Sequence, residues 1–343
     1  MRWQLTRPQW TILAVLLVAA LVGWSVAYFT RSPMERADAI TEPTAFDQPP
    51  IFVGMHGVAE AAALKPFALA LNEKKLLVSY LSTDRVDEFS DRLEFRRTLH
   101  LRQNEPASIT GVAVEGDRIY ATDFVSGDLL VAEYKTGKLL QSYGWLPGYQ
   151  TRMKALGVAY FQNNLYVSDV ASGKMLAIGA LAQKDVRDEG ELIVAFPNGG
   201  PSEFELGYPT WSMVTADGRL LVSDAKSGEV KAFTCSGRSA HLFDQAEPAR
   251  LKTPMGIAMD DLRSPELLAK ARRVFDPSRV HELGRIHVVD AAQARVKVFD
   301  ALGKYVLTYG EELRQPNGIA IDPKQRLIYI SDVQLRAIAL YKY

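Results

Sequence analysis

The sequence predicts an all-β protein: a six-bladed β-propeller with four-stranded antiparallel blades, preceded by one N-terminal transmembrane helix. Three observations lead to this prediction. One pair of strands recurs six times, the copies are spaced as propeller blades are, and the first thirty residues hold a long run without charge. A period of about 40–50 residues is typical of propellers, in which each four-stranded unit shields its neighbours.

The recurring unit is clearest near the C-terminus. Residues 315–322 (QPNGIAID) precede 327–332 (LIYISD), and residues 253–260 (TPMGIAMD) precede 286–290 (IHVVD) and 295–299 (RVKVF). In each copy a small apolar strand is followed by a turn and by a β-branched strand that ends in Ser-Asp or a variant of it. The residues that close this second strand are Tyr80, Asp123, Asp169, Asp224, Asp290 and Asp332, separated by 43, 46, 55, 66 and 42 positions.

Three structural roles follow from the repeat. The first strands are expected to crowd the propeller axis, where glycine and alanine allow backbones to approach closely. The recurring aspartates are interpreted as acceptors of backbone N–H groups in the turns, because the same residue type closes five of the six copies. The last copy ends after its third strand, so residues 50–54 (PIFVG) are predicted to supply its fourth strand and close the ring.

The motifs resemble the NHL repeat, with Pro-x-Gly-Ile-Ala-x-Asp, then Ile-Tyr-x-Ser-Asp, then Arg-Val-x-Val-Phe. The resemblance covers residues 51–343 and is sharpest at 253–259, 286–299 and 316–332. It implies a β-propeller with a binding surface. It does not imply one activity, because the family includes ubiquitin-ligase targeting domains, RNA binders and an amidating lyase.

One position in each first strand tests for a site in the central channel: the residue before the glycine, or before the residue that replaces it. Together with Trp211, which replaces the glycine of the fourth copy, these positions are the candidate ligand contacts at the channel mouth. They are Phe67, Thr110, Leu156, Thr210, Met255 and Asn317. The set holds no His, Asp or Glu, whereas calcium sites usually include carboxylates. We therefore expect no metal, no cofactor and no catalytic residue there.

Residues 316–318 (PNG) also resemble gluconolactonase-like propellers, whose metal-binding Asn lies in this motif. That resemblance would make Asn317 a metal ligand, but the matching carboxylate and second Asn do not occur at the other five positions. Two hypotheses remain open. The favoured one is a non-catalytic scaffold that binds a protein or another ligand; the alternative is a propeller hydrolase or lactonase with a divalent metal in the channel.

Other chemistries have little support in the sequence. Of five histidines only His287 falls in an inner strand of a repeat, and one histidine cannot build a zinc site. The single cysteine, Cys235, cannot form an intramolecular disulfide. The 40 basic and 40 acidic residues give zero net charge, so we expect no nucleic-acid partner.

Residues 8–30 contain no charged side chain and are long enough to span a bilayer as a helix. Aromatic residues near both ends favour an uncleaved anchor, and the alternative is a cleaved signal with small residues at 25 and 27. We expect residues 1–31 to be a cytoplasmic tip and single-pass anchor, 32–50 an extended tether, and 51–343 a monomeric propeller on the extracytoplasmic, periplasmic side.

Two departures from the regular repeat are candidate docking sites for an unknown protein partner. A helix is predicted within the insertion at 261–283, where Lys270, Arg272 and Arg273 would face solvent. The loop at 144–149 is predicted to expose Trp145 and Tyr149. Aromatic residues of this kind occur both as core filler and as ligand contacts.

Overall fold

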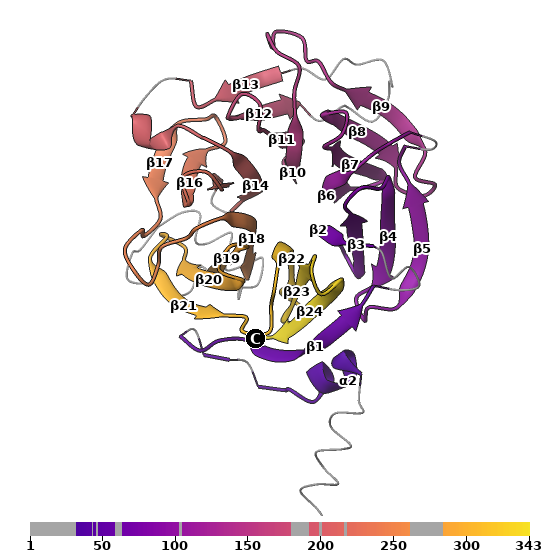
Figure 1. The fold of residues 1–343 in the computed structure, drawn as a ribbon, viewed down its shortest axis with the longest axis vertical. Helices are drawn as coiled ribbons and strands as arrows, with labels where there is room; N and C mark the ends of the chain where they lie inside the picture. Colours follow the sequence, from indigo (N-terminus) through magenta and orange to yellow (C-terminus); the bar gives the residue numbers. More distant parts are fainter. Residues whose placement is uncertain are drawn as a thin grey trace, which may run out of the picture.

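Six four-stranded antiparallel sheets are arranged radially around a central axis (Figure 1). The computed structural model describes residues 32–42, 44–45, 47–58, 64–102, 105–179, 192–198, 201–215, 218–260 and 284–343. The predicted anchor at 1–31 and the predicted helical insertion at 261–283 lie outside these ranges. Within the described ranges, no helix has the length and apolarity that a membrane crossing needs.

The first three blades each run from an inner to an outer strand in chain order. Their strands are β2 (Pro66–Asn72), β3 (Lys75–Tyr80), β4 (Arg85–Ser90), β5 (Phe95–His100); β6 (Ile109–Glu115), β7 (Arg118–Asp123), β8 (Asp128–Glu133), β9 (Leu139–Tyr143); β10 (Ala155–Phe161), β11 (Asn164–Asp169), β12 (Lys174–Gly179) and β13 (Leu192–Phe196).

The fourth and fifth blades follow the same order, and the outer strand of the sixth blade comes from the N-terminal side of the propeller. Their strands are β14 (Pro209–Val214), β15 (Arg219–Asp224), β16 (Glu229–Thr234), β17 (Ser239–Leu242); β18 (Pro254–Asp260), β19 (Arg285–Asp290), β20 (Arg295–Asp300), β21 (Tyr305–Tyr309); β22 (Pro316–Asp322), β23 (Leu327–Asp332), β24 (Ala337–Lys342) and β1 (Ile51–Gly57).

The predicted closure of the ring is confirmed. Strand β1 pairs antiparallel with β24, with Met55 opposite Ala339 and Ile51 opposite Lys342. The N-terminal and C-terminal strands of the propeller thus share one sheet, and β1 pairs with the outer edge of β24, which would otherwise be open.

Burial falls from the second strand of a blade to its outer strand. Every residue of β19 and β23 is buried, whereas β5 and β9 are mostly half-buried or exposed. This explains why the second strands read as continuous β-branched and aromatic runs: both of their faces pack against neighbouring blades.

All six inner strands contain a bulge at the same place. In β22, Pro316 pairs with Asp332 and the next pair is Ile319 with Ile330, so Asn317 and Gly318 drop out of the ladder. Equivalent register shifts occur in the other five blades. A bulge re-aims side chains, and here it contains every position that the sequence marked as a channel-mouth candidate.

One end of the propeller carries the turns between second and third strands and the long connections from one blade to the next. We call it the loop face, defined by the turns at 81–84, 124–127, 170–173, 225–228, 291–294 and 333–336 and the connections that enter each inner strand. The two sets are joined in every blade by a backbone bond, such as Val333 N–H to the carbonyl of Gln315. The turns between third and fourth strands lie at the opposite end.

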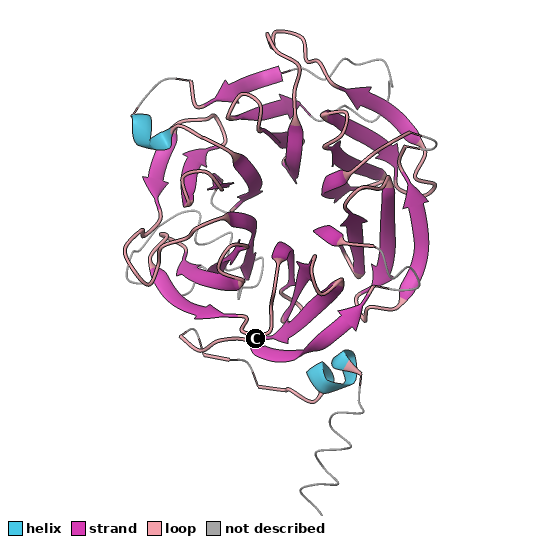
Figure 2. Ribbon diagram, in the orientation of Figure 1, coloured by secondary structure: helices cyan, strands magenta, loops and turns pink. Residues whose placement is uncertain are grey.

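The segment before β1 is not the extended tether that the sequence predicted. Residues Pro33–Asp38 form helix α2, begun by a capping box in which the Ser32 hydroxyl accepts from Glu35 N–H and the Glu35 carboxylate accepts from Ser32 N–H. Met34 and Ala37 are buried in the core beside blades 6 and 1. Short apolar residues at helical spacing in a proline-rich segment were the missed signal. Figure 2 shows α2 and the single 3-10 turn η1 (Ser202–Phe204) as the helical elements that are described.

The last residue of α2 and the residues that follow it are held to the propeller by polar bonds. Asp38 pairs with Arg92 at 2.5 Å, and Arg326 donates to the carbonyl of Thr41 at 2.7 Å. Arg285 donates to the carbonyl of Gln48 at 3.1 Å. The described residues between 32 and 48 therefore form a strap along the rim of blades 1, 6 and 5 (Figure 1).

Candidate functional site

The six channel-mouth candidates do lie together around the axis, one on each inner strand, but they do not line an open site. Five of them are buried, and Met255 is half-buried. The hydroxyl groups of Thr110 and Thr210 bond to the backbone of the next blade, and the Asn317 amide bonds to its own strand.

The two threonines among them bond to the backbone of the following blade. The Thr110 hydroxyl donates to the carbonyl of Leu156 at 2.9 Å, and the Thr210 hydroxyl donates to the carbonyl of Pro254 at 2.9 Å. Both are nearly inaccessible to solvent. Each hydroxyl thereby satisfies a buried carbonyl between two inner strands.

A second bridge uses the serine that precedes the recurring aspartate. In blade 6 the Ser331 hydroxyl accepts from Gly318 N–H at 2.8 Å and donates to the carbonyl of Phe67 in blade 1 at 2.6 Å. In blade 3 the Ser168 hydroxyl joins Gly157 N–H to the carbonyl of Thr210 in blade 4. The glycines are required because a Cβ at Gly157 would lie 2.3 Å from the Thr210 carbonyl oxygen.

Two blades lack that glycine, and they lie opposite each other. Blade 1 has Ala68 and blade 4 has Trp211, three steps apart in a ring whose inner strands contact in order. The rings of Phe67 and Trp211 meet across the axis with centroids 5.1 Å apart and planes tilted by 45°. Leu81, Met255 and Val333 belong to the same apolar cluster. Side chains therefore fill the axis at the level of the bulges.

Asn317 is held in the wall of the ring. It is buried, and its side-chain amide donates to the carbonyl of Gln315 at 3.2 Å. No group of three His, Cys, Asp or Glu side chains placed to hold a metal occurs in the described part of the chain.

The interpretation of the recurring aspartates is confirmed. Asp169 accepts from the N–H groups of Lys154 and Ala171, which belong to the two connections that meet at the loop face. Asp123 accepts in the same way from Ser108 and Val125. In blade 1 the replacement, Tyr80, turns its hydroxyl to Asp87 at 2.8 Å.

The docking candidates have different outcomes. Trp145 is 58% exposed on the loop face, as predicted. Tyr149 is not a free contact, because its hydroxyl donates to Asp169 at 2.7 Å and lies 2.6 Å from the Ser172 hydroxyl, and burial raises the pKa of its phenol to about 12. Lys270, Arg272 and Arg273 lie outside the described residues.

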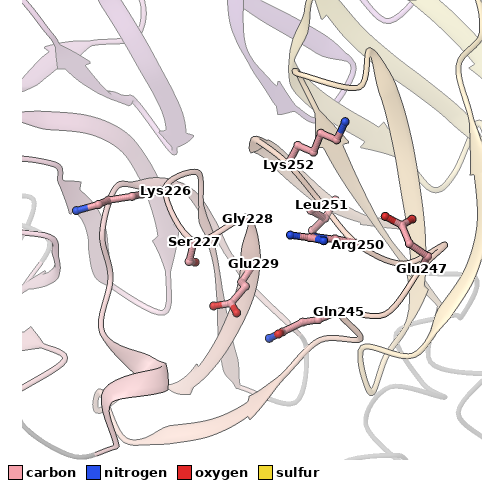
Figure 3. A pocket seen from close by; sticks show the side chains of 9 residues that line it. All are labelled: Lys226, Ser227, Gly228, Glu229, Gln245, Glu247, Arg250, Leu251 and Lys252. Carbon is pink, nitrogen blue, oxygen red and sulfur yellow. The ribbon is translucent and has the colours of Figure 1, made fainter.

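A pocket that the sequence did not reveal lies on the loop face between blades 4 and 5 (Figure 3). Its volume is about 650 Å³, within the usual range for ligand sites. One wall is the turn from Lys226 to Glu229, and the other is the connection from β17 to β18. The lining residues are Lys226, Ser227, Gly228, Glu229, Gln245, Glu247, Arg250, Leu251 and Lys252.

Buried lysines hold both walls of this pocket from beneath. Lys231 of β16 lies 3.2 Å from Glu229 and donates to the carbonyl of Glu205 at 2.5 Å. Lys297 of β20 donates to the carbonyls of Pro248 and Arg250, and burial lowers the pKa of its ammonium. The two lysines occupy equivalent strand positions, opposite Val222 and Val288.

A second feature missed from the sequence is a buried polar cluster at the far end of blade 5. Asp260, Arg285 and His287 are fully buried. The Asp260 carboxylate lies 2.7 Å from Arg285 Nε and 3.0 Å from His287 Nε2, while His287 Nδ1 lies 3.0 Å from the Tyr309 hydroxyl. Because Arg285 also bonds to the strap, the cluster links blade 5 to Ala45 and Gln48.

Comparisons with known proteins identify the fold. A streptogramin B lyase matches with a TM-score of 0.55 at 12% identity, over 84% of this chain and 86% of that one. Virginiamycin B lyase from Staphylococcus aureus matches with a TM-score of 0.55, and its catalytically inactive histidine-to-alanine variant with quinupristin with 0.57, both at 12% identity and over 84% of this chain. They are covered over 98% and 99% of their own chains.

No protein-family model matches this sequence, and no curated protein does. The NHL resemblance therefore remains a prediction. At 12% identity the structural likeness extends to the six-bladed β-propeller architecture and to nothing finer.

Proposed function

We propose that the protein is a non-catalytic binding propeller, held at a membrane by residues 8–30, whose loop face binds a partner on the extracytoplasmic side. The observation that carries the proposal is the Phe67–Trp211 contact at 5.1 Å. These rings occupy the axis where a channel enzyme would place its substrate.

The chemistry around the axis supports the same conclusion. A catalytic group must reach its substrate within hydrogen-bond distance and with a titrating or nucleophilic atom available. The Thr110 and Thr210 hydroxyls instead bond to carbonyls of the next blade, and the Asn317 amide bonds to its own strand.

The loop face offers what a binding surface needs. It carries the exposed indole of Trp145, and exposed aromatic side chains are enriched among residues that dominate binding energy. It also carries the pocket between blades 4 and 5, whose polar walls are held rigidly by Lys231 and Lys297.

The membrane part of the proposal rests on the charge-free run at 8–30. Because α2 begins at Pro33 and is packed on the propeller, an anchor ending near residue 30 would leave almost no free tether. The propeller would then lie close to the bilayer with its rim at blades 6 and 1 nearest to it.

The test is quantitative capture of the cross-linked full-length protein from its native membrane, with wild type compared with two matched variants. Trp145→Ala on the loop face should reduce recovery of the specific partner several-fold. Leu302→Ala, which removes a 40% exposed side chain at the opposite end, should leave recovery unchanged. Equal recovery with both variants would remove the loop face from the proposal.

The alternative, a propeller hydrolase or lactonase with a channel metal, is tested on the same preparation. Calcium-dependent turnover of a lactone that is abolished in Asn317→Ala would establish the alternative and overturn the non-catalytic proposal. Unchanged lactone levels with and without calcium support the binding function.

A further inference from the structure

In the pocket between blades 4 and 5, one serine of the repeat lacks the hydrogen bond that its equivalents make in other blades. In blade 2 the Ser126 hydroxyl donates to Asp123 at 2.9 Å, and in blade 3 the Ser172 hydroxyl donates to Asp169 at 2.6 Å. In both blades the serine three positions after the aspartate stabilises the turn and has its hydroxyl proton committed.

Blade 4 has the same serine, Ser227, without that bond. The Asp224 carboxylate accepts from Gly207 N–H at 2.8 Å and lies 3.5 Å from the ammonium of Lys231. Among the described residues nothing bonds to the Ser227 hydroxyl, which lines the pocket. Lys231, from the following strand, lies beside the Asp224 carboxylate where the other blades place a serine hydroxyl. The Ser227 hydroxyl is therefore available to a ligand.

Two cationic side chains of the opposite wall also lack hydrogen-bond partners among the described residues. Arg250 and Lys252 are exposed, and no described side chain or carbonyl bonds to the guanidinium or the ammonium. In Figure 3 the Arg250 side chain extends toward the turn that carries Ser227 and Gly228. An unpaired guanidinium offers a planar pair of N–H donors that matches a carboxylate.

The pocket's carboxylates are balanced from below. Glu229 lies 3.2 Å from the Lys231 ammonium. Glu247 attracts the buried ammonium of Lys297. The lining holds three cations, Lys226, Arg250 and Lys252, and two carboxylates, so the pocket presents a net positive charge to a ligand.

The backbone between these groups is fixed before a ligand arrives. Gly228 has φ of +70°, and a Cβ there would lie 2.8 Å from the carbonyl oxygen of Leu251. The Arg250 carbonyl accepts from Lys297 and from the Gln293 amide at 2.9 Å. Such preorganisation lowers the entropy lost on binding.

We propose that this pocket binds a carboxylate group, with Arg250 as its bidentate partner, Lys252 as a second positive charge and Ser227 as a hydroxyl donor. The carboxylate is either a side chain of an acidic peptide segment or part of a free small molecule. This inference rests on the proposed function, because it assigns the chemistry of one site on the loop face.

The test measures binding of a fluorescein-labelled tetra-glutamate peptide to the full-length protein in mild detergent, with citrate, inorganic phosphate and a labelled tetra-lysine peptide as the other probes. Arg250→Gln should weaken binding about 10-fold, Lys252→Gln and Ser227→Ala about 3- to 5-fold, and raised salt should weaken it further. Lys304→Gln, an exposed lysine at the opposite end of blade 5, is the matched control and should change nothing.

The outcomes separate the two sources of the carboxylate. Binding of the peptide with no displacement by citrate indicates an acidic partner segment, whereas citrate binding of equal strength indicates a free carboxylate; both support the inference. It is overturned if phosphate binds more tightly than citrate, if tetra-lysine binds as well as tetra-glutamate, if neither carboxylate probe binds, or if the Arg250→Gln, Lys252→Gln double variant keeps its affinity. If any of these results is obtained while partner capture still requires Trp145, the carboxylate site is removed and the binding-propeller proposal is left standing.

Discussion

Blades 2, 3, 5 and 6 keep glycine in the bulge of the inner strand, and blades 1 and 4 replace it with Ala68 and Trp211. Where glycine is kept, the next blade's carbonyl comes so close that a Cβ would lie between 2.3 and 3.0 Å from it, as at Gly157 and Gly111. Where glycine is lost, the side chains of opposite blades fill the axis instead. The conserved part of the repeat thus brings neighbouring blades together, whereas the side chains of the two blades that lack the glycine fill the central axis.

The largest effect is expected when glycine is placed in the bulge of blade 4, as in blades 2, 3, 5 and 6. Trp211→Gly removes the ring that packs on Phe67 and leaves a cavity in a buried apolar cluster. Loss of a buried tryptophan costs about 4 kcal/mol of unfolding free energy. We expect a loss of this size in urea denaturation.

The control for Trp211→Gly is a change to its ring partner, Phe67. Phe67→Ala and the double variant complete a double-mutant cycle, in which the two losses should be less than additive by about 1 kcal/mol. Strict additivity would show that the rings do not stabilise each other across the axis.

The reverse change sharpens the contrast from the other side. Gly157→Ala places a methyl group 2.3 Å from the Thr210 carbonyl oxygen, a rigid obstacle, and should destabilise the fold by about 3 kcal/mol. Gly57→Ala on β1 is the matched control, since no atom lies within 4 Å of its added Cβ. If thermal unfolding shifted equally for the two variants, close approach would not be the reason for the glycine.

Most of this architecture could be predicted from sequence because it repeats. Six copies of one strand pair fix the blade number, and the missing fourth strand of the last copy predicts the closure by β1. The role of Asp123 and Asp169 followed from recurrence alone, because one residue type in equivalent turns has one structural explanation.

The candidate site could not be predicted because it depends on departures that interact over long separations. The sequence shows that Trp211 replaces a glycine, but not that its ring meets Phe67, which lies three blades away. It shows Ser227 in the position of Ser126 and Ser172, but not that the Lys231 ammonium lies 3.5 Å from Asp224. Side-chain partners outside the local strand pair carry no periodic signal.

The serine before the recurring aspartate distinguishes blade 6 from blade 4, with a smaller effect. Ser331→Ala leaves Gly318 N–H and the Phe67 carbonyl unsatisfied in a buried place and should cost about 2 kcal/mol. Ser223 is its equivalent in blade 4, where Trp211 replaces the glycine and the serine hydroxyl has no partner among the described residues. Ser223→Ala should therefore change the urea midpoint little, and a loss equal to that of Ser331→Ala would contradict the distinction between the blades.

The smallest expected effect concerns blade 5, whose inner strand ends in the Asp260–His287 cluster. Burial lowers the pKa of His287 below its ordinary value of 6.5, so the folded protein holds a neutral imidazole. The unfolded chain takes up a proton as the pH falls below about 6.5 and the folded chain does not, so the unfolding free energy decreases from there until the lowered pKa is reached. The decrease should be about 1 kcal/mol between pH 6.5 and 5.5.

His287→Gln should reduce this dependence of the unfolding free energy on pH, whereas His100→Gln, which changes an exposed histidine at the rim, should not. A wild-type unfolding free energy that increased as the pH fell over this range would show that the imidazole is already protonated in the fold, and a constant value would show that burial does not shift its pKa; either result would contradict the neutral imidazole.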